Sequence, residues 1–214
     1  GRLSESVIFR NHDVQVIANP VSPSMISPSS RLQARKALGI RDDQFVGLTI
    51  AEQLDDPNKC VRETVETFFN TLDSLAIDSA YILIGSGGAG IEKDFPKVVR
   101  LGQLASQDIS KLGPAANVSI SMSTAESSGL TIAEAGAMGV LPIARNVGGM
   151  PEQIKDGHDG YLCDSFSELS RVISFSVANP STVNRMGSLA RDKILKERAG
   201  ANVARKYIEL YSSL

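Results

Sequence analysis

The sequence has no tryptophan, two cysteines among its 214 residues, and an aromatic content of 5%. Cys60 and Cys163 lie far apart without metal-type spacing, so we expect no disulfide framework, and a reducing compartment fits best. No apolar run approaches the ~18 residues of a membrane-spanning helix, and no stretch resembles a signal peptide. A net charge of −2 argues against nucleic-acid binding through a general basic field.

The composition is that of a globular protein, with 42% hydrophobic and 21% charged residues. The length suits one domain of ordinary size with a full core. Residues 2–10 have the pattern of the end of a helix, and the chain begins without methionine. We therefore expect it to be a piece of a longer protein.

Short apolar runs alternate with stretches of helical spacing. Strands are predicted over residues 14–18, 44–51, 80–84, 98–104, 117–122, 140–144 and 161–163. Helices are predicted over residues 31–38, 61–75, from a Ser106 cap onward, 129–138, and from 165 to the end with a break at 179–180. This alternation predicts an α/β fold, a Rossmann-like doubly wound parallel sheet.

Ligands of such sheets bind beyond the carboxyl ends of the strands. That rule selects the loops at residues 51–59, 85–90, 103–107, 123–130 and 145–151. In the fourth loop, small residues ending in Ser128 and Gly129 open a helix. The free N–H groups of about residues 128–131 and the helix dipole would attract an anion such as a phosphate.

Two carboxylates accompany this helix start. Glu134 lies some 7 Å along the helix at ~1.5 Å per residue, about the distance from a diphosphate to the ribose of the same nucleotide. Its carboxylate could accept hydrogen bonds from both hydroxyls of a diol, or it could be a salt-bridged glutamate. Glu126 precedes the helix and could bind sugar hydroxyls, or it could simply compensate the helix dipole.

Two further features are weaker. Lys59 could reach a phosphate as a point charge, although a solvated lysine at a helix start is the more common reading. The GSGGAG loop from Gly85 to Gly90 follows a strand, but glycine-rich loops of this kind are mostly structural and it is no convincing dinucleotide motif.

The run ESSGLTIAEAGAMGVLPIARNVGGMPEQIKDGHDGYL resembles the motif of retaining, nucleotide-sugar-dependent glycosyltransferases of the GT-B fold (group 1, family 4 type). That motif has two glutamates separated by seven residues, then Gly-Gly-x-Pro-Glu and an Asp-Gly turn. The stretches VIANPVSP, YILIGSGG and VVRLGQL extend the resemblance over nearly the whole chain.

The resemblance implies the donor-binding C-terminal half of a GT-B enzyme. Residues 1–18 would end a missing acceptor domain and form the first strand. Residues 19–30 would be the crossover linker, 31–180 the Rossmann-like donor domain and 181–214 the C-terminal helices. The fragment alone would bind a nucleotide sugar weakly and would not transfer it.

The resemblance also assigns roles to residues. Glu134 would bind the ribose and Glu126 the donor sugar. The diphosphate would be held by Lys59 and by the helix start, that is, Ser128, Gly129 and Leu130. Gly85 would lie in the strand-to-loop turn of the donor site, and the backbone of Gln103 and Leu104 would contact the base.

Further expectations follow from the resemblance. No metal or other cofactor is expected, because cationic side chains replace the metal. The acceptor would be a glycan or lipid-linked molecule of polysaccharide or lipopolysaccharide synthesis. The protein would be cytoplasmic, with any peripheral membrane contact through the missing half.

Three positions depart from the motif. Gln53 stands where an arginine is usual, Ser128 replaces an aromatic residue, and Arg145-Asn146 replaces a Ser/Thr-Asp pair. We hypothesise that Arg145 supplies the charge that Gln53 lacks. Two alternatives remain open: another enzyme of the same fold, such as a nucleotide-sugar epimerase or a glycan phosphorylase, and a non-catalytic GT-B-like module.

Overall fold

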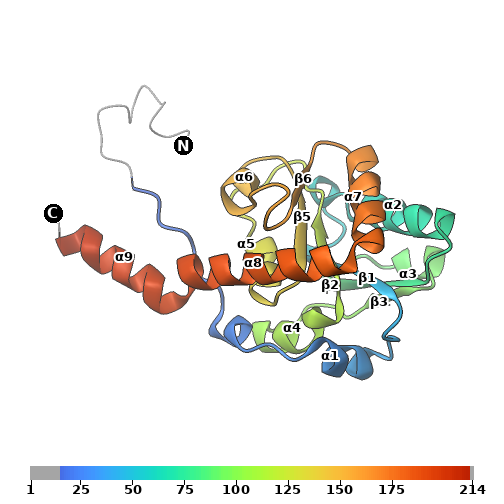
Figure 1. Cartoon of the computed structure of the whole chain (residues 1–214), viewed down its shortest axis with the longest axis horizontal. Helices are drawn as coiled ribbons and strands as arrows, with labels where there is room; N and C mark the ends of the chain where they lie inside the picture. Colours follow the sequence, from blue (N-terminus) through green and yellow to red (C-terminus); the bar gives the residue numbers. More distant parts are fainter. Residues whose placement is uncertain (1–14, 213–214) are drawn as a thin grey trace.

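The computed structural model describes residues 15–212, and six of their segments form one parallel sheet in the order β3-β2-β1-β4-β5-β6 (Figure 1). The strands are β1 (Phe45–Gln53), β2 (Ser79–Ser86), β3 (Val98–Arg100), β4 (Val118–Ser121), β5 (Leu141–Arg145) and β6 (Tyr161–Cys163). Helices connect consecutive strands, which confirms the predicted doubly wound α/β fold. The strand order reverses between β1 and β4, which is where such folds place ligands.

The helices begin and end where local sequence signals allow. Their bounds are α1 (Arg31–Leu38), α2 (Val61–Ser74), α3 (Ile91–Asp94), α4 (Ser106–Leu112), α5 (Leu130–Ala137), α6 (Met150–Gln153), α7 (Phe166–Ala178), α8 (Pro180–Arg198) and α9 (Gly200–Ser212), with 3-10 turns η1 (Pro23–Ile26), η2 (Pro57–Lys59) and η3 (Gly113–Ala115). Helix α1 starts with a capping box between Ser30 and Gln33 and stops at Gly39, whose φ is +67°. The helix has the predicted bounds; Gly39 is the stop signal on which the prediction rested, and the capping box is a feature that the structure adds.

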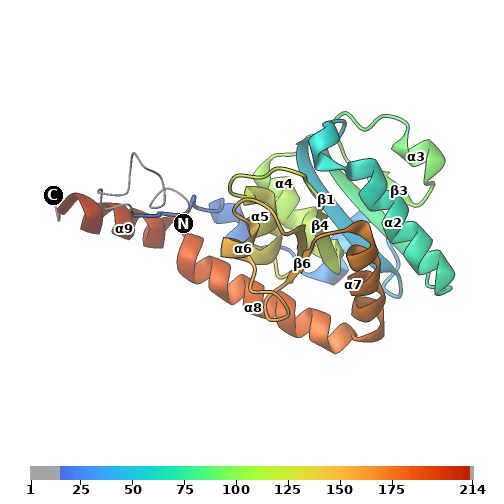
Figure 2. The same cartoon turned by 90° about the horizontal axis from the view of Figure 1, so that it is seen from above.

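The sheet separates two large apolar clusters, because alternate residues of a strand point to opposite faces. Along β2, Tyr81 and Leu83 belong to the cluster beneath α2 and α7, with Phe68 as a central side chain. Ile82 and Ile84 belong to the other cluster, which includes residues of α1, α4 and α5. Figure 2 shows helices on both sides of the sheet, with α8 running along one side and α9 extending beyond it.

Four sequence predictions need correction or lie outside the described residues. Residues 15–18 form no strand, and Val16 is 69% exposed, since the sheet offers this segment no partner. The predicted strand over 98–104 ends at Arg100, before Gly102 turns the chain with a φ of +70°. Ala105, not Ser106, is the N-cap of α4. The expected helix end at residues 2–10 lies outside the described part of the chain.

Within residues 15–212, none of the helices combines the length and the apolar character needed to cross a membrane.

Candidate functional site

A cavity of about 510 Å³ opens at the point where the strand order reverses. The carboxyl ends of β1 and β4 and the first residues of α5 surround it. Its lining consists of Thr49, Ile50, Ala51, Glu52, Gln53, Asp56, Lys59, Ser121, Ser123, Glu126, Ser128, Leu130 and Thr131. Two of the predicted ligand loops, 51–59 and 123–130, therefore meet at one cavity although they are distant in sequence.

The start of α5 presents unpaired backbone donors to this cavity. Within the described residues, the amides of Gly129, Leu130 and Thr131 have no acceptor, and no side chain caps the helix. Gly129 has a φ of +53°, and a Cβ there would collide with the side chain of Met150. The glycine is thus required by backbone conformation and packing, and it leaves the helix end open to an anion.

The glycine pair of the motif, Gly148-Gly149, packs closely against the loop that precedes α5. A Cβ on Gly148 would collide with the carbonyl oxygen of Glu126, and one on Gly149 with that of Ser127. Gln153, 5% exposed, donates its side-chain amide to the carbonyl oxygen of Ser128. Sequence reasoning missed Gln153, because nothing in the chain indicates that α6 reaches back across 25 residues.

Lys59 and Glu126 form an ion pair inside the cavity. The Lys59 Nζ lies 2.9 Å from Glu126 Oε2, and the side chains are 28% and 18% exposed. The backbone N–H of Ser127 donates to the other carboxylate oxygen at 3.2 Å. Lys59 is therefore not a simply solvated lysine, and Glu126 makes no hydrogen bond to the helical amides.

Glu134 lies one turn along α5 from Leu130 and Thr131, on the same helix face as these two lining residues. It is half-buried, and desolvation raises the pKa of its carboxyl group. Within the described part of the chain it has no hydrogen bond and no ion pair, so the salt-bridge alternative is wrong. A half-buried carboxylate without a protein partner is suited to a hydroxyl-bearing ligand.

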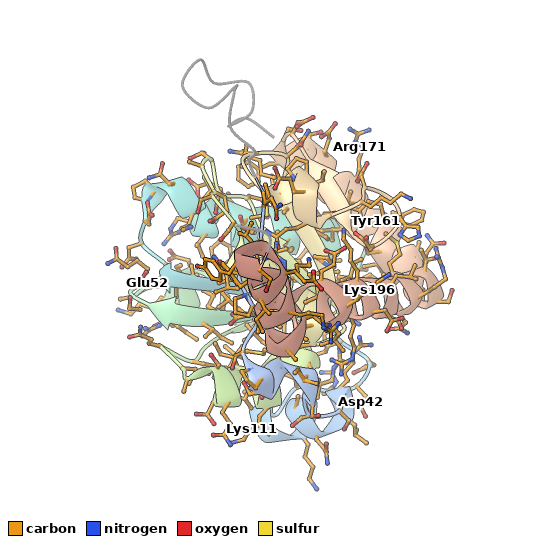
Figure 3. All side chains as sticks on the ribbon, turned by 90° about the vertical axis from the view of Figure 1, so that its left-hand side faces the viewer. Asp42, Glu52, Lys111, Tyr161, Arg171 and Lys196 are labelled. Atoms are coloured by element: carbon orange, nitrogen blue, oxygen red, sulfur yellow. The ribbon has the colours of Figure 1, made fainter. Side chains whose placement is uncertain are left out.

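Sequence reasoning did not single out the acidic residues Glu52 and Asp56, which also line the cavity. Both lie within residues 51–59, a range that the carboxyl-end rule had selected, so their position in the sequence was a signal that could have found them. Lys59 is the one positively charged side chain among the lining residues that the structure describes. Figure 3 shows Glu52 on the opposite side of the molecule from Tyr161 and Arg171, which line a separate hollow.

The glycine-rich loop 85–90 is occupied by contacts within the protein. A Cβ on Gly85 would collide with the carbonyl oxygen of Ala51, and Gly88 donates its amide to Asp55 Oδ1 at 2.7 Å. Gly85 is buried and does not line the cavity. The close packing of β1 against β2 accounts for Gly85. This agrees with the interpretation of the loop as mostly structural.

Gln103 and Leu104 follow β3 at the same carboxyl edge of the sheet. Gln103 is exposed, and Leu104 packs against the α1–α4–α5 cluster. Neither lines the cavity. Their expected contact with a base remains a prediction.

Arg145 lies at the end of β5 and does not line the cavity. Its guanidinium carbon is 5.5 Å from the ring centroid of Phe166, within cation–π range. Ile143 and Leu141, which share its side of the strand, pack in the cluster beneath α2 and α7. This position gives no support to the hypothesis that Arg145 replaces the missing charge.

Comparison with known proteins points to one class. Residues 95–193 match the family described as glycosyl transferases group 1. The N-acetyl-alpha-D-glucosaminyl L-malate synthase of Bacillus anthracis is 25% identical over 217 residues, covering 97% of this chain and 56% of the synthase.

Solved structures agree on the fold. Sucrose-phosphate synthase from Thermosynechococcus elongatus superposes with a TM-score of 0.82 at 20% identity, over 99% of this chain and 55% of that one. Anabaena HepE, in complex with UDP-glucose, has a TM-score of 0.69 at 23% identity, over 91% of this chain and 54% of its own. The chain thus has the Rossmann-like fold of GT-B glycosyltransferases and spans about half the length of these relatives. Within this fold, residues 95–193 are similar to group 1 glycosyl transferases.

Proposed function

We propose that this chain is the donor-binding domain of a retaining glycosyltransferase of the family 4 type and binds a nucleoside diphosphate sugar in the cavity between β1 and β4. The observation that carries the proposal is that the start of α5, with its free amides, and Lys59 border one cavity at the carboxyl ends of β1 and β4. The unpartnered Glu134 does not line this cavity itself but lies one turn further along α5. The UDP-glucose complex of HepE is consistent with it.

Each group has a chemical task in this proposal. The α5 amides and Lys59 hold the diphosphate and stabilise the negative charge that develops on it when the glycosidic bond breaks. Glu134 accepts hydrogen bonds from the ribose hydroxyls, and Glu126 from those of the donor sugar. Retention of anomeric configuration rests on the sequence resemblance alone.

The acceptor belongs to the proposal as well. The resemblance favours a glycan or lipid-linked acceptor, bound by a domain outside this chain, and a cytoplasmic location. Transfer of a hexose therefore requires that second domain, and the chain by itself is expected to bind without transferring.

A non-catalytic donor-binding module is the second candidate. The specific observation in its favour is the charge of the cavity: Gln53 replaces the expected arginine, and Glu52 and Asp56 add negative charge next to a single lysine. Such a cavity would hold a diphosphate less tightly than one with two cations.

A binding panel tests the donor site. We expect isothermal titration calorimetry to detect millimolar or tighter binding of a UDP-, GDP- or ADP-sugar to the 214-residue chain. Absence of binding across all three bases would contradict a donor site of any kind. Binding together with no transfer by the intact protein, across donors and acceptors, would favour the non-catalytic module.

A further inference from the structure

The Lys59–Glu126 ion pair involves the one lysine among the described residues that line the cavity, so a bound diphosphate would compete with Glu126 for it. Its 2.9 Å contact and the low exposure of both side chains, 28% and 18%, make it a specific pair rather than a loose surface contact. A diphosphate bound at the start of α5 would need the same ammonium group.

Transfer of Lys59 from Glu126 to a phosphate leaves the carboxylate without its cation. Glu126 would keep the hydrogen bond from the Ser127 amide, yet the rest of its charge would stay poorly solvated in the cavity. Removing one partner of a partly buried pair is costly because the other charge loses its compensation.

An intact nucleotide sugar avoids this cost. Its diphosphate takes Lys59, and its sugar hydroxyls can donate hydrogen bonds to the freed carboxylate of Glu126. A nucleoside diphosphate without a sugar replaces only one of the two partners.

We propose that the Lys59–Glu126 pair makes this site select an intact nucleotide sugar over the corresponding nucleoside diphosphate. The inference rests on the proposed donor site and adds a specificity-determining role for the pair. It also means that cleavage of the sugar weakens retention of the diphosphate product, since Glu126 then reclaims Lys59.

The test compares UDP with UDP-glucose, or the GDP and ADP equivalents if the panel selects another base, on the Glu126→Gln variant. Glutamine no longer holds Lys59, so UDP should bind roughly three- to tenfold more tightly than to the unchanged chain. UDP-glucose gains the lysine too but loses its charged hydroxyl acceptor, so the preference for the nucleotide sugar should fall by at least threefold.

Glu52→Gln is the matched control. Glu52 lines the same cavity and carries the same charge, but no ion pair links it to Lys59 within the described residues. UDP carries up to one more negative charge near neutral pH than UDP-glucose, so this control measures how far the loss of one cavity charge alone lowers the UDP-glucose to UDP affinity ratio. The fall of that ratio in Glu126→Gln should clearly exceed the fall in Glu52→Gln.

A second variant separates the pair from other effects. On a Lys59→Gln background there is no ammonium to release, so adding Glu126→Gln should give no further gain in UDP affinity. If Glu126→Gln weakens UDP binding, or leaves the affinity ratio unchanged while the original chain binds both ligands, the inference is wrong but the donor site stands. If the original chain binds neither ligand of any base, the proposed function fails and the inference with it.

Discussion

Two loops that contain glycine at positive φ follow parallel strands at the same edge of this sheet, and only the second of them borders the 510 Å³ cavity. The loop at 85–90 follows β2 and precedes α3, which has four residues. The loop at 125–129 follows β4 and precedes α5, which has eight. In the first, Asp55 accepts the amide of Gly88; in the second, the amides at the helix start remain without acceptors in the described part of the chain.

The difference shows what glycine reports in such loops. Gly85 and Gly87 allow close approach to Ala51 and Asp55, so their lack of a side chain serves packing. Gly129 also permits close packing, against Met150. It differs in standing at the start of a helix, α5, whose first residues and free backbone donors border the cavity. Free backbone donors, rather than glycine content, distinguish the candidate ligand site.

Matched glycine substitutions would break this comparison most directly. Gly129→Ala places a Cβ at a φ of +53° against Met150, so we expect a loss of about 2–4 kcal/mol of stability from strain and overpacking. Binding of the nucleotide sugar should fall at least tenfold at a temperature where the variant is folded, as calorimetry and a melting curve can establish.

Gly87→Ala is the counterpart in the other loop. Its Cβ, at a φ of +73°, would collide with the Asp55 carboxylate, so a loss of about 1–3 kcal/mol is expected. Nucleotide-sugar affinity of the folded variant should be unchanged. A tenfold drop in affinity for Gly87→Ala would show that the 85–90 loop belongs to the site.

Glu134→Gln should separate binding from stability. Hydrogen bonds to a charged acceptor typically contribute about 1.5–3 kcal/mol, so nucleotide affinity should fall by one to two decades. The raised pKa of Glu134 means that the native state binds its proton more tightly than the unfolded chain. Stability of the unchanged protein therefore decreases as pH rises from the unfolded pKa, about 4.3, through the higher native pKa.

The glutamine variant has no such pH-dependent loss. It should melt at a higher temperature than the unchanged protein at pH 7 and at about the same temperature at pH 3.5, where both side chains are neutral. Equal affinity for the nucleotide in both proteins would remove Glu134 from the site, whatever the melting curves show.

Gln153 tests how far the support of the open loop matters. Gln153→Met keeps the side-chain length but loses the hydrogen bond to the Ser128 carbonyl. We expect roughly two- to fivefold weaker UDP binding, since one neutral hydrogen bond contributes about 0.5–1.5 kcal/mol. Uridine, which has no phosphate, should bind as before. Lys155→Ala, an exposed change just after the same helix, is the control.

The sequence predicted elements best where a local signal was complete. Ser30 and Gly39 bracket α1, and its predicted bounds are correct. VQVIA has strand-like alternation, but residues 15–18 form no strand, because pairing depends on a neighbour that a local pattern cannot supply. β3 ends at Arg100, because Gly102 turns the chain with a φ of +70°. The apolar residues on both sides of Gly102 gave no sign of this turn.

The candidate site was predictable in parts but not in its pairing. The carboxyl-end rule and the glutamate spacing located the cavity loops, since both depend on local sequence. The Lys59–Glu126 contact joins residues 67 apart, and the orientation of Arg145 toward Phe166 depends on the side of β5 it occupies. Both are tertiary consequences of strand order and register, which no local motif encodes.

Substitution of Arg145 is expected to have the smallest effect on stability, and it tests whether the donor site contains a second cation. If its guanidinium serves mainly the ring of Phe166, Arg145→Ala should cost about 0.5–1 kcal/mol of stability and leave nucleotide-sugar affinity unchanged. Arg145→Met, which keeps much of the packing, should recover part of that stability. A tenfold loss of affinity in both variants would place Arg145 in the site after all, because only the lost charge is common to the two changes. The donor site would then include a second cation, and the loop after β5 would contribute to it together with the loop before α5.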